Sequence, residues 1–169
     1  FTSRNPQQLM ALNVLLDPTI QLISLFGPAG TGKTFLALLA GLYHVLIKND
    51  YQKILVSRPV IPLGRDIGYL PGTMEEKLRS WMLPIYDNLE FIAHSARASG
   101  HLETIEHEQR DFGKRGRQHR GKRGDRISLE DLIRSEKLSL EAITYMRGRS
   151  IPYQFILIDE AQNLTPHEV

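Results

Sequence analysis

The 169-residue sequence contains no cysteine. Disulfide scaffolds, thiolate-bound metals and cysteine nucleophiles are therefore excluded, and the composition does not point to an oxidising or a reducing compartment. The sequence also lacks a long hydrophobic run. The longest, residues 35–47, has 13 residues and includes Gly41 and His44, whereas a helix that crosses a bilayer needs about 20 apolar residues. We therefore expect no membrane span.

The first residue is Phe1, and no basic stretch leads into an apolar segment, so the sequence shows no signal peptide. We expect a cytoplasmic protein, and we interpret the chain as a piece of a longer one. Its composition, 41% hydrophobic and 24% charged, is typical of soluble globular proteins. The length predicts a single domain over residues 1–169.

The net charge of +2 is small but unevenly distributed. Residues 107–126 carry eight Lys and Arg against three acidic residues, a net +5, which leaves −3 for the rest. This segment has four glycines and only one large apolar side chain, Phe112, so it has little surface to bury. We predict a flexible basic insertion. It would serve either as an RNA-binding arm or simply as a solvated loop.

The first half of the chain predicts a parallel α/β arrangement. Asn5 as N-cap and Pro6 at the first helical position indicate a helix start. The apolar, β-branched run Ile20–Phe26 predicts a buried strand, and a core helix follows to about Ile47. A second strand is expected over Lys53–Ser57. Strand, glycine-rich turn, helix and strand in this order are typical of a βαβ unit with a right-handed crossover.

The second half is predicted as shorter elements. The expected order is a loop over 59–72, a helix capped by Thr73 that reaches about residue 83, a helix from Pro84 to 92, a short helix from Ser128, an ambiguous strand over 140–146 and a short apolar strand over 155–158.

The segment GPAGTGKT fits the phosphate-binding pattern GxxxxGK[ST], or Walker A motif, between the predicted strand and helix. Gly30 and Gly32 lack a Cβ, so consecutive backbone N–H groups can turn inward and surround phosphate oxygens at a helix N-terminus. Lys33 would neutralise the β and γ phosphates, and Thr34 would bind Mg²⁺. A glycine-rich turn without a ligand is the alternative, which the flanking elements disfavour. The predicted nucleotide-binding residues are Gly27, Pro28, Ala29, Gly30, Thr31, Gly32, Lys33 and Thr34.

The strand over 155–158 ends in Asp159 and Glu160. Open α/β sheets bind ligands at the carboxyl ends of their strands, so this strand predicts the matching acidic motif, Walker B. Asp159 would hold Mg²⁺ and Glu160 would polarise the attacking water. Taken alone, such acids are more often solvated strand ends. Together with the P-loop they make Lys33, Asp159 and Glu160 the predicted catalytic residues.

The chain resembles the PhoH family of ATPases in four stretches: GPAGTGKT, SRPVIPLGRDIGYLPGTMEEKL (57–78), MRGRSIP (146–152) and IDEAQNLTPHEV (158–169). The resemblance implies a RecA-like, three-layer α/β/α ATPase core akin to helicases of superfamily 1, with ATP and Mg²⁺ as cofactors. It implies action on RNA or single-stranded nucleic acid. It also implies homo-oligomerisation and, in one branch of the family, an N-terminal nuclease domain.

In this class of ATPase a central strand comes later in sequence than the acidic strand. A chain that stops at Val169 is therefore expected to lack that strand, together with the sensor and arginine elements. Because an arginine finger contributes about 10³ to 10⁵ in rate, we expect slow turnover from this piece.

Five further site residues rest on the resemblance, each with an alternative. Gln8 would contact adenine, or would only cap the first helix. Ser57 and Arg58 would contact a nucleic-acid backbone, or Arg58 would be a surface charge. Arg147 and Arg149 would reach ATP phosphates or nucleic acid, or would pair with acids of the domain.

Three functions follow. The first is an ATP-hydrolysing, nucleic-acid-dependent enzyme. The second is an ATP-switched regulatory or binding module without motor activity. The third is a small-molecule kinase, which the sequence DEAQ (159–162) disfavours.

Overall fold

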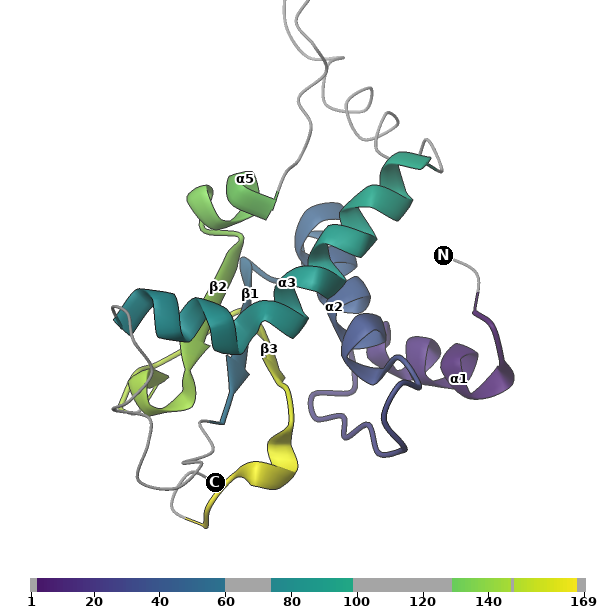
Figure 1. Ribbon diagram of the computed structural model, residues 1–169. Coiled ribbons are helices and arrows are strands. Elements are labelled where there is room, and N and C mark those ends of the chain that lie inside the picture. The colour runs from purple at the N-terminus through teal and green to yellow at the C-terminus, as the bar shows by residue number, and fades with distance from the viewer. Residues whose placement is uncertain (1–2, 60–73, 99–128, 147, 167–169) are drawn as a thin grey trace, which may run out of the picture.

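A computed structural model describes residues 3–59, 74–98, 129–146 and 148–166 (Figure 1). It is an α/β structure with a three-stranded parallel sheet in the order β2-β1-β3. The strands are β1 (Lys53–Arg58), β2 (Leu138–Ala142) and β3 (Gln154–Ile158). The α/β class and the parallel sheet predicted from the sequence are therefore confirmed.

The helices differ greatly in length. They are α1 (Pro6–Leu15), α2 (Lys33–Tyr43) continued by the π-helical turn η1 (His44–Lys48), the long α3 (Met74–Ala98), the short α5 (Leu129–Arg134) and the 3₁₀ turns η3 (Ile143–Met146) and η4 (Ala161–Asn163). None of these described helices is long and apolar enough to cross a membrane.

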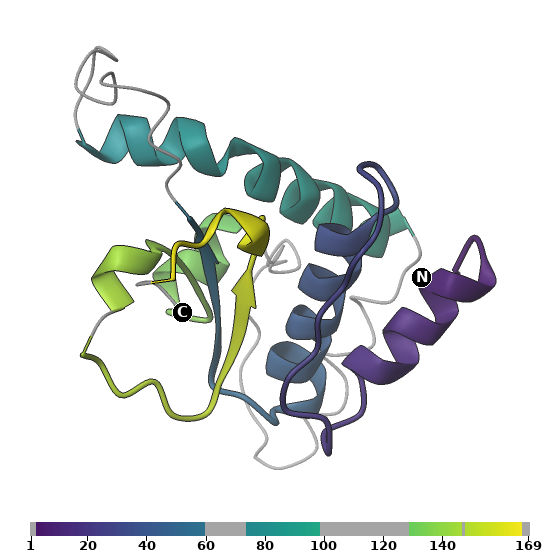
Figure 2. The same cartoon turned by 90° about the horizontal axis from the view of Figure 1, so that it is seen from below.

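The main core lies on one face of the sheet. Ile54 of β1 stands opposite Phe155 and Leu138 on the two neighbouring strands, and these side chains share a face. Helix α2, its continuation η1 and helix α3 cover that face with buried side chains, among them Leu38, Val45, Met82, Ile85 and Leu89. Figure 2 shows α3 running across the sheet and α2 beside β3.

The opposite face of β3 is open, since Ile156 and Ile158 are 43% and 36% exposed. The two helices that pack on the main core, α2 and α3, lie on the other face. The second helical layer of a three-layer core stays a prediction.

The strand predicted over Ile20–Phe26 is wrong, because the structure shows no strand there. The run is not buried throughout as predicted: Ile23 and Leu25 pack against a small cluster around Leu36, whereas Leu22 and Phe26 are 90% and 103% exposed. A strand also needs a neighbour for its backbone N–H and C=O groups. None of the described strands pairs with this segment.

The predicted helix break at Pro84 is also wrong. Pro84 lies inside the continuous helix α3, which Figure 1 shows bent. A proline in a helix interior removes one hydrogen bond and usually bends the helix. On either side of Pro84, Met82 and Ile85 are almost fully buried in the core. This packing outweighs the local cost of the proline.

Other predicted elements are confirmed. Asn5 caps α1, and its Oδ1 accepts the backbone N–H of Gln8 at 2.8 Å. The predicted strands over 53–57 and 155–158 correspond to β1 and β3. The ambiguous stretch 140–146 comprises the end of β2 and the turn η3. The predicted caps Thr73 and Ser128, most of the loop over 59–72 and the basic insertion 107–126 lie outside the described residues.

Candidate functional site

The glycine-rich segment Gly27–Thr34 leads directly into α2. Gly30 and Gly32 have φ angles of 77° and 88°, in the left-handed region that glycine adopts without steric cost. Gly32 is the N-cap of α2 and provides no side-chain cap. The first N–H groups of α2 therefore have no acceptor from the cap residue, and such groups bind anions.

Lys33 folds back over this segment. Its Nζ donates to the carbonyl oxygens of Gly27 at 2.9 Å and Pro28 at 2.8 Å, and the Thr31 hydroxyl also donates to Pro28 at 2.9 Å. These acceptors are neutral, and an ammonium group bonds more strongly to a charged oxygen. A phosphate that entered the loop would therefore compete well for Lys33.

Gln8 lies against the same loop. Its Nε2 donates to the carbonyl of Thr31 at 3.2 Å, and its Oε1 accepts the backbone N–H of Arg4 at 2.9 Å. The helix-cap alternative is present in the hydrogen bond from Gln8 N–H to Asn5. The side chain nevertheless extends from α1 to the P-loop, 23 residues along the chain. Its contact with adenine stays a prediction.

The two predicted metal ligands meet in space. The Thr34 hydroxyl donates to Asp159 Oδ1 at 2.7 Å, although the two residues are 125 positions apart. Asp159 directly follows β3, and its N–H continues the ladder by donating to Ser57 O at 2.9 Å. Hydroxyl and carboxylate oxygens suit Mg²⁺, which prefers hard oxygen ligands. The donor set therefore fits the predicted ion.

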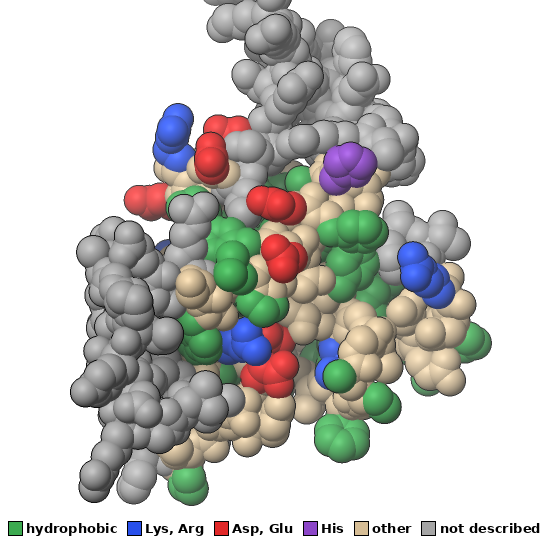
Figure 3. Space-filling view, in the orientation of Figure 1, with side chains coloured by type: hydrophobic (Ala, Val, Ile, Leu, Met, Phe, Trp, Pro, Cys, Tyr) green, Lys and Arg blue, Asp and Glu red, His purple; other side chains and the backbone are tan. Residues whose placement is uncertain are grey.

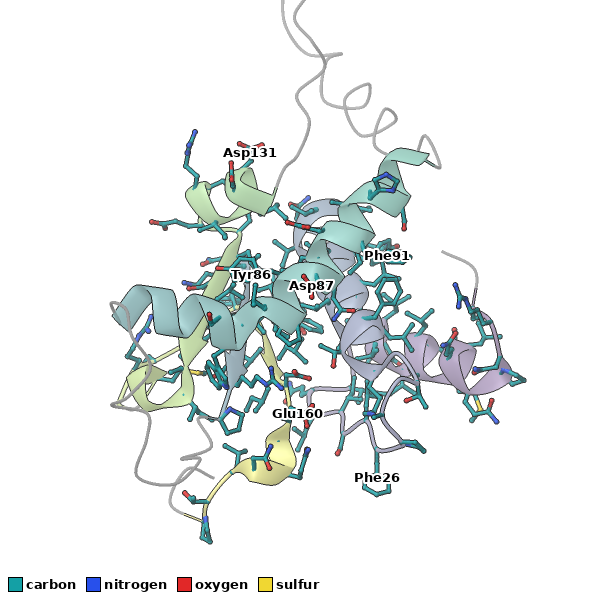
Figure 4. All side chains as sticks on the ribbon, in the orientation of Figure 1. Phe26, Tyr86, Asp87, Phe91, Asp131 and Glu160 are labelled. Carbon is teal, nitrogen blue, oxygen red and sulfur yellow. The ribbon has the colours of Figure 1, made fainter. Side chains whose placement is uncertain are left out.

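Glu160, next along the chain, has a left-handed backbone at φ 54° and ψ 39° and is the N-cap of η4. Its side chain is 43% exposed and accepts a hydrogen bond from Gln162 Nε2. Figure 4 labels Glu160 just beyond β3, near the glycine-rich loop, whereas Phe26 points away from the molecule. Gln162 was not among the predicted site residues, and the available signal was its place in DEAQ.

Arg58 is the last residue of β1, and its side chain turns toward the acidic half of the site. The Arg58 side chain is 21% exposed, and its guanidinium faces the acids, with Nε 3.8 Å from Asp159 Oδ2 and Nη2 3.9 Å from Glu160 Oε1. Its Nη1 donates to the backbone carbonyl of Trp81 at 3.2 Å. Figure 3 shows basic and acidic side chains side by side at this end of the sheet. The contacts that the structure gives Arg58 are with the acidic half of the site and with α3, and its contact with nucleic acid stays a prediction.

The other nucleic-acid candidates divide. Ser57 is fully buried, and its hydroxyl has no hydrogen-bond partner among the described residues. Arg149 pairs through Nη1 with Glu141 Oε2, which is the ion pair named as its alternative. Arg147 lies outside the described part of the chain. Nucleic-acid contact by any of them stays a prediction.

The comparison with known protein families agrees with this geometry. The family model described as PhoH-like protein matches residues 1–169. Protein PhoH2 of Bacillus subtilis (strain 168) is 48% identical over 166 residues, which is 98% of this chain and 31% of that protein.

Two further relatives are more distant. Protein PhoH2 of Mycolicibacterium smegmatis is 34% identical over 162 residues, 95% of this chain and 30% of that protein. A PhoH-like protein of Synechocystis sp. is 32% identical over 143 residues, 85% of this chain and 34% of that protein. The chain thus spans about a third of the length of these relatives. With a family match over its whole length and a P-loop joined to an acidic strand, the chain belongs to the PhoH family and carries its P-loop ATPase-like domain.

Proposed function

We propose that this domain binds ATP with Mg²⁺ and hydrolyses it. The observation that carries the proposal is the hydrogen bond from Thr34 to Asp159. It brings a phosphate-binding loop and a carboxylate from a distant strand to one point. A glycine-rich turn that bound no ligand would not explain why this carboxylate lies beside it.

Each residue has a separate role in this proposal. The backbone N–H groups of Gly27–Thr34 and the Lys33 ammonium bind the phosphates, and Thr34 with Asp159 holds Mg²⁺. When bound, the ion offsets negative charge on the phosphates. Glu160, more exposed than Asp159, orients a water molecule and accepts its proton.

Calorimetric titration with ATP and Mg²⁺ tests the binding step. Lys33→Ala should abolish measurable binding, because it removes the cation that lies over the loop. Lys48→Ala removes the same charge from an exposed position in η1 and should bind as the parent does. Equal affinity of all three proteins would refute the phosphate assignment.

Phosphate release tests the hydrolytic step. Glu160→Gln keeps the size of the side chain and should retain ATP while losing turnover, by roughly 10²- to 10⁴-fold for the loss of a general base. Turnover at the parent rate would remove Glu160 from the proposed role. Lost ATP binding would show instead that Glu160 supports the fold or the nucleotide.

RNA or single-stranded nucleic acid is the proposed partner, supported by the net +5 over residues 107–126. If about four of these cations engage phosphates, affinity for single-stranded RNA should fall about 50-fold between 50 and 200 mM salt. Absent or salt-independent binding favours the alternative, an ATP-switched regulatory module. A homo-oligomer and a nuclease domain in the longer protein are further proposals from the resemblance. A cytoplasmic location is a further proposal from the sequence.

A further inference from the structure

Arg58 joins three structural elements. It ends β1, its guanidinium faces the acids that follow β3, and it donates to a backbone carbonyl in the first half of α3. Both of its distances to Asp159 and Glu160 exceed that of a hydrogen bond, whereas the 3.2 Å contact with Trp81 O lies within that range. Arg58 is therefore fixed to α3 and attracted to the acids, with Nε and Nη2 directed at the site.

Among the described residues around this point, the formal charges balance. Lys33 and Arg58 carry two positive charges, and Asp159 and Glu160 carry two negative ones. A bound polyphosphate adds negative charge to this site, and its divalent cation adds positive charge. The cation competes with Arg58 for the carboxylates, and the phosphates offer the guanidinium a more strongly charged partner. Arg58 cannot keep the same partners when the site is filled.

The contact with α3 falls at a weak point of that helix. Pro84 has no N–H, so the carbonyl of Ser80 loses its helical donor, and Trp81 is the next residue. Helices bend most easily at such positions. A shift of Arg58 therefore acts on α3 in the turn that resists bending least.

We propose that Arg58 is a positioning residue of the nucleotide site, which senses the occupied site through Asp159 and Glu160 and transmits it to α3 through the Trp81 carbonyl. This inference rests on the proposed nucleotide binding. It gives Arg58 a role at ATP in place of the nucleic-acid contact expected from the sequence.

The sequence provides its own probe, because Trp81 is the one tryptophan among the 169 residues and packs against the main core. We would titrate the chain with the non-hydrolysable analogue adenylyl imidodiphosphate and Mg²⁺, following tryptophan emission and, separately, calorimetric heat. The parent should show a saturable change in emission at the calorimetric affinity. Arg58→Met should bind about 3- to 30-fold more weakly. At saturation it should show no change in emission.

Two variants control this result. Arg134→Met removes the same charge from an exposed position on α5 and should respond as the parent does. Arg58→Lys keeps the charge and protects against a misfolded Arg58→Met, but an ammonium lacks the guanidinium fork that reaches both acids and Trp81 O. It should also lose the emission change.

The outcomes separate this inference from the function beneath it. If the parent binds no nucleotide by calorimetry, the proposed function fails and this inference fails with it. If the parent binds but Arg58→Lys or Arg58→Met at saturation keeps the full emission change, only the role of Arg58 is overturned. A parent that binds without any change in Trp81 emission overturns it as well.

Discussion

Each half of the candidate site contains a residue in the left-handed conformation, but only one of them is glycine. Gly32, in the P-loop half, has a φ of 88°, and Glu160, in the acidic half, has a φ of 54°. For a residue with a side chain this conformation costs about 1–2 kcal/mol. In the P-loop the proposed phosphate ligand binds backbone N–H groups, so the position is glycine, which has no side chain. At Glu160 the proposed chemistry needs the carboxylate, so the strain is retained.

The two halves are joined by a close helix-to-strand contact. A Cβ added to Gly41 of α2 would lie 2.9 and 3.1 Å from ring carbons of Phe155 in β3. Helix α2 begins with the P-loop residues Lys33 and Thr34, and the acids Asp159 and Glu160 directly follow β3. The missing side chain at Gly41 therefore lets α2 approach β3 closely enough for Thr34 to meet Asp159.

The largest effect is expected from separating the halves. Gly41→Val should destabilise the fold by about 1–3 kcal/mol, because the larger side chain overpacks the contact with the Phe155 ring. Urea unfolding measures this loss. Adding Phe155→Leu should recover part of it, since the two positions touch and their effects should not add. Strictly additive losses would mean that Gly41 does not act through Phe155.

A second effect should be confined to the P-loop half. Gly32→Ala should cost about 1–2 kcal/mol for the left-handed backbone. It should also weaken ATP binding, since the loop can no longer keep its shape. Gly148 has a φ of 71°, and a Cβ added to it would meet open space. Gly148→Ala therefore imposes the same backbone cost outside the site. Calorimetry should show weakened binding for Gly32→Ala only. Equal weakening in both would attribute the effect to general instability.

A third, smaller effect should appear in the acidic half with the opposite sign. Glu160→Gly and Glu160→Ala both lose the carboxylate, but only glycine relieves the left-handed strain. The glycine variant should unfold with a free energy about 1 kcal/mol higher than the alanine variant. Both should lose phosphate release. Equal stabilities would show that the backbone at Glu160 is not strained.

The smallest effect is a pH dependence just after α1, in the segment that leads along the chain to the P-loop. Hydrogen bonds from the Thr19 hydroxyl and backbone N–H lower the pKa of Asp17 below its ordinary value. Because the pKa of Asp17 is lower in the folded state than in the unfolded state, ionised Asp17 stabilises the fold at pH values above the unfolded-state pKa. This contribution disappears as the pH falls through the lower, folded-state pKa. Thr19→Val should raise the pKa of Asp17 toward its usual range in an NMR titration. An unchanged pKa would leave only the backbone hydrogen bond responsible.

Sequence alone predicts what is local. Three features depend on residues within one short stretch: the P-loop, the Asn5 cap and the acidic end of β3. The residue pattern of each predicts its backbone geometry directly. Ile20–Phe26 and Gln154–Ile158 show the limit of that approach. Both are short apolar runs, yet only the second pairs with β1, because pairing depends on a partner that the run itself does not encode.

The remaining differences depend on contacts between distant parts of the chain. Helix α3 continues through Pro84 because Met82 and Ile85 are buried in the core, which no local propensity indicates. Arg58 turns to Asp159 and Glu160 because β1 and β3 run parallel and end at the same edge of the sheet. The sequence placed the acids at that edge but did not show that Arg58 would face them.

The central claim is that the two halves form one site for ATP and Mg²⁺. Its most direct test is the Mg²⁺ dependence of ATP affinity, measured by calorimetry for the parent and for Asp159→Asn. The asparagine oxygen still accepts the Thr34 hydrogen bond, but the charge that holds the ion is gone. We expect Mg²⁺ to strengthen ATP binding by the parent and to have little effect on binding by Asp159→Asn. The same Mg²⁺ dependence in both proteins would contradict it.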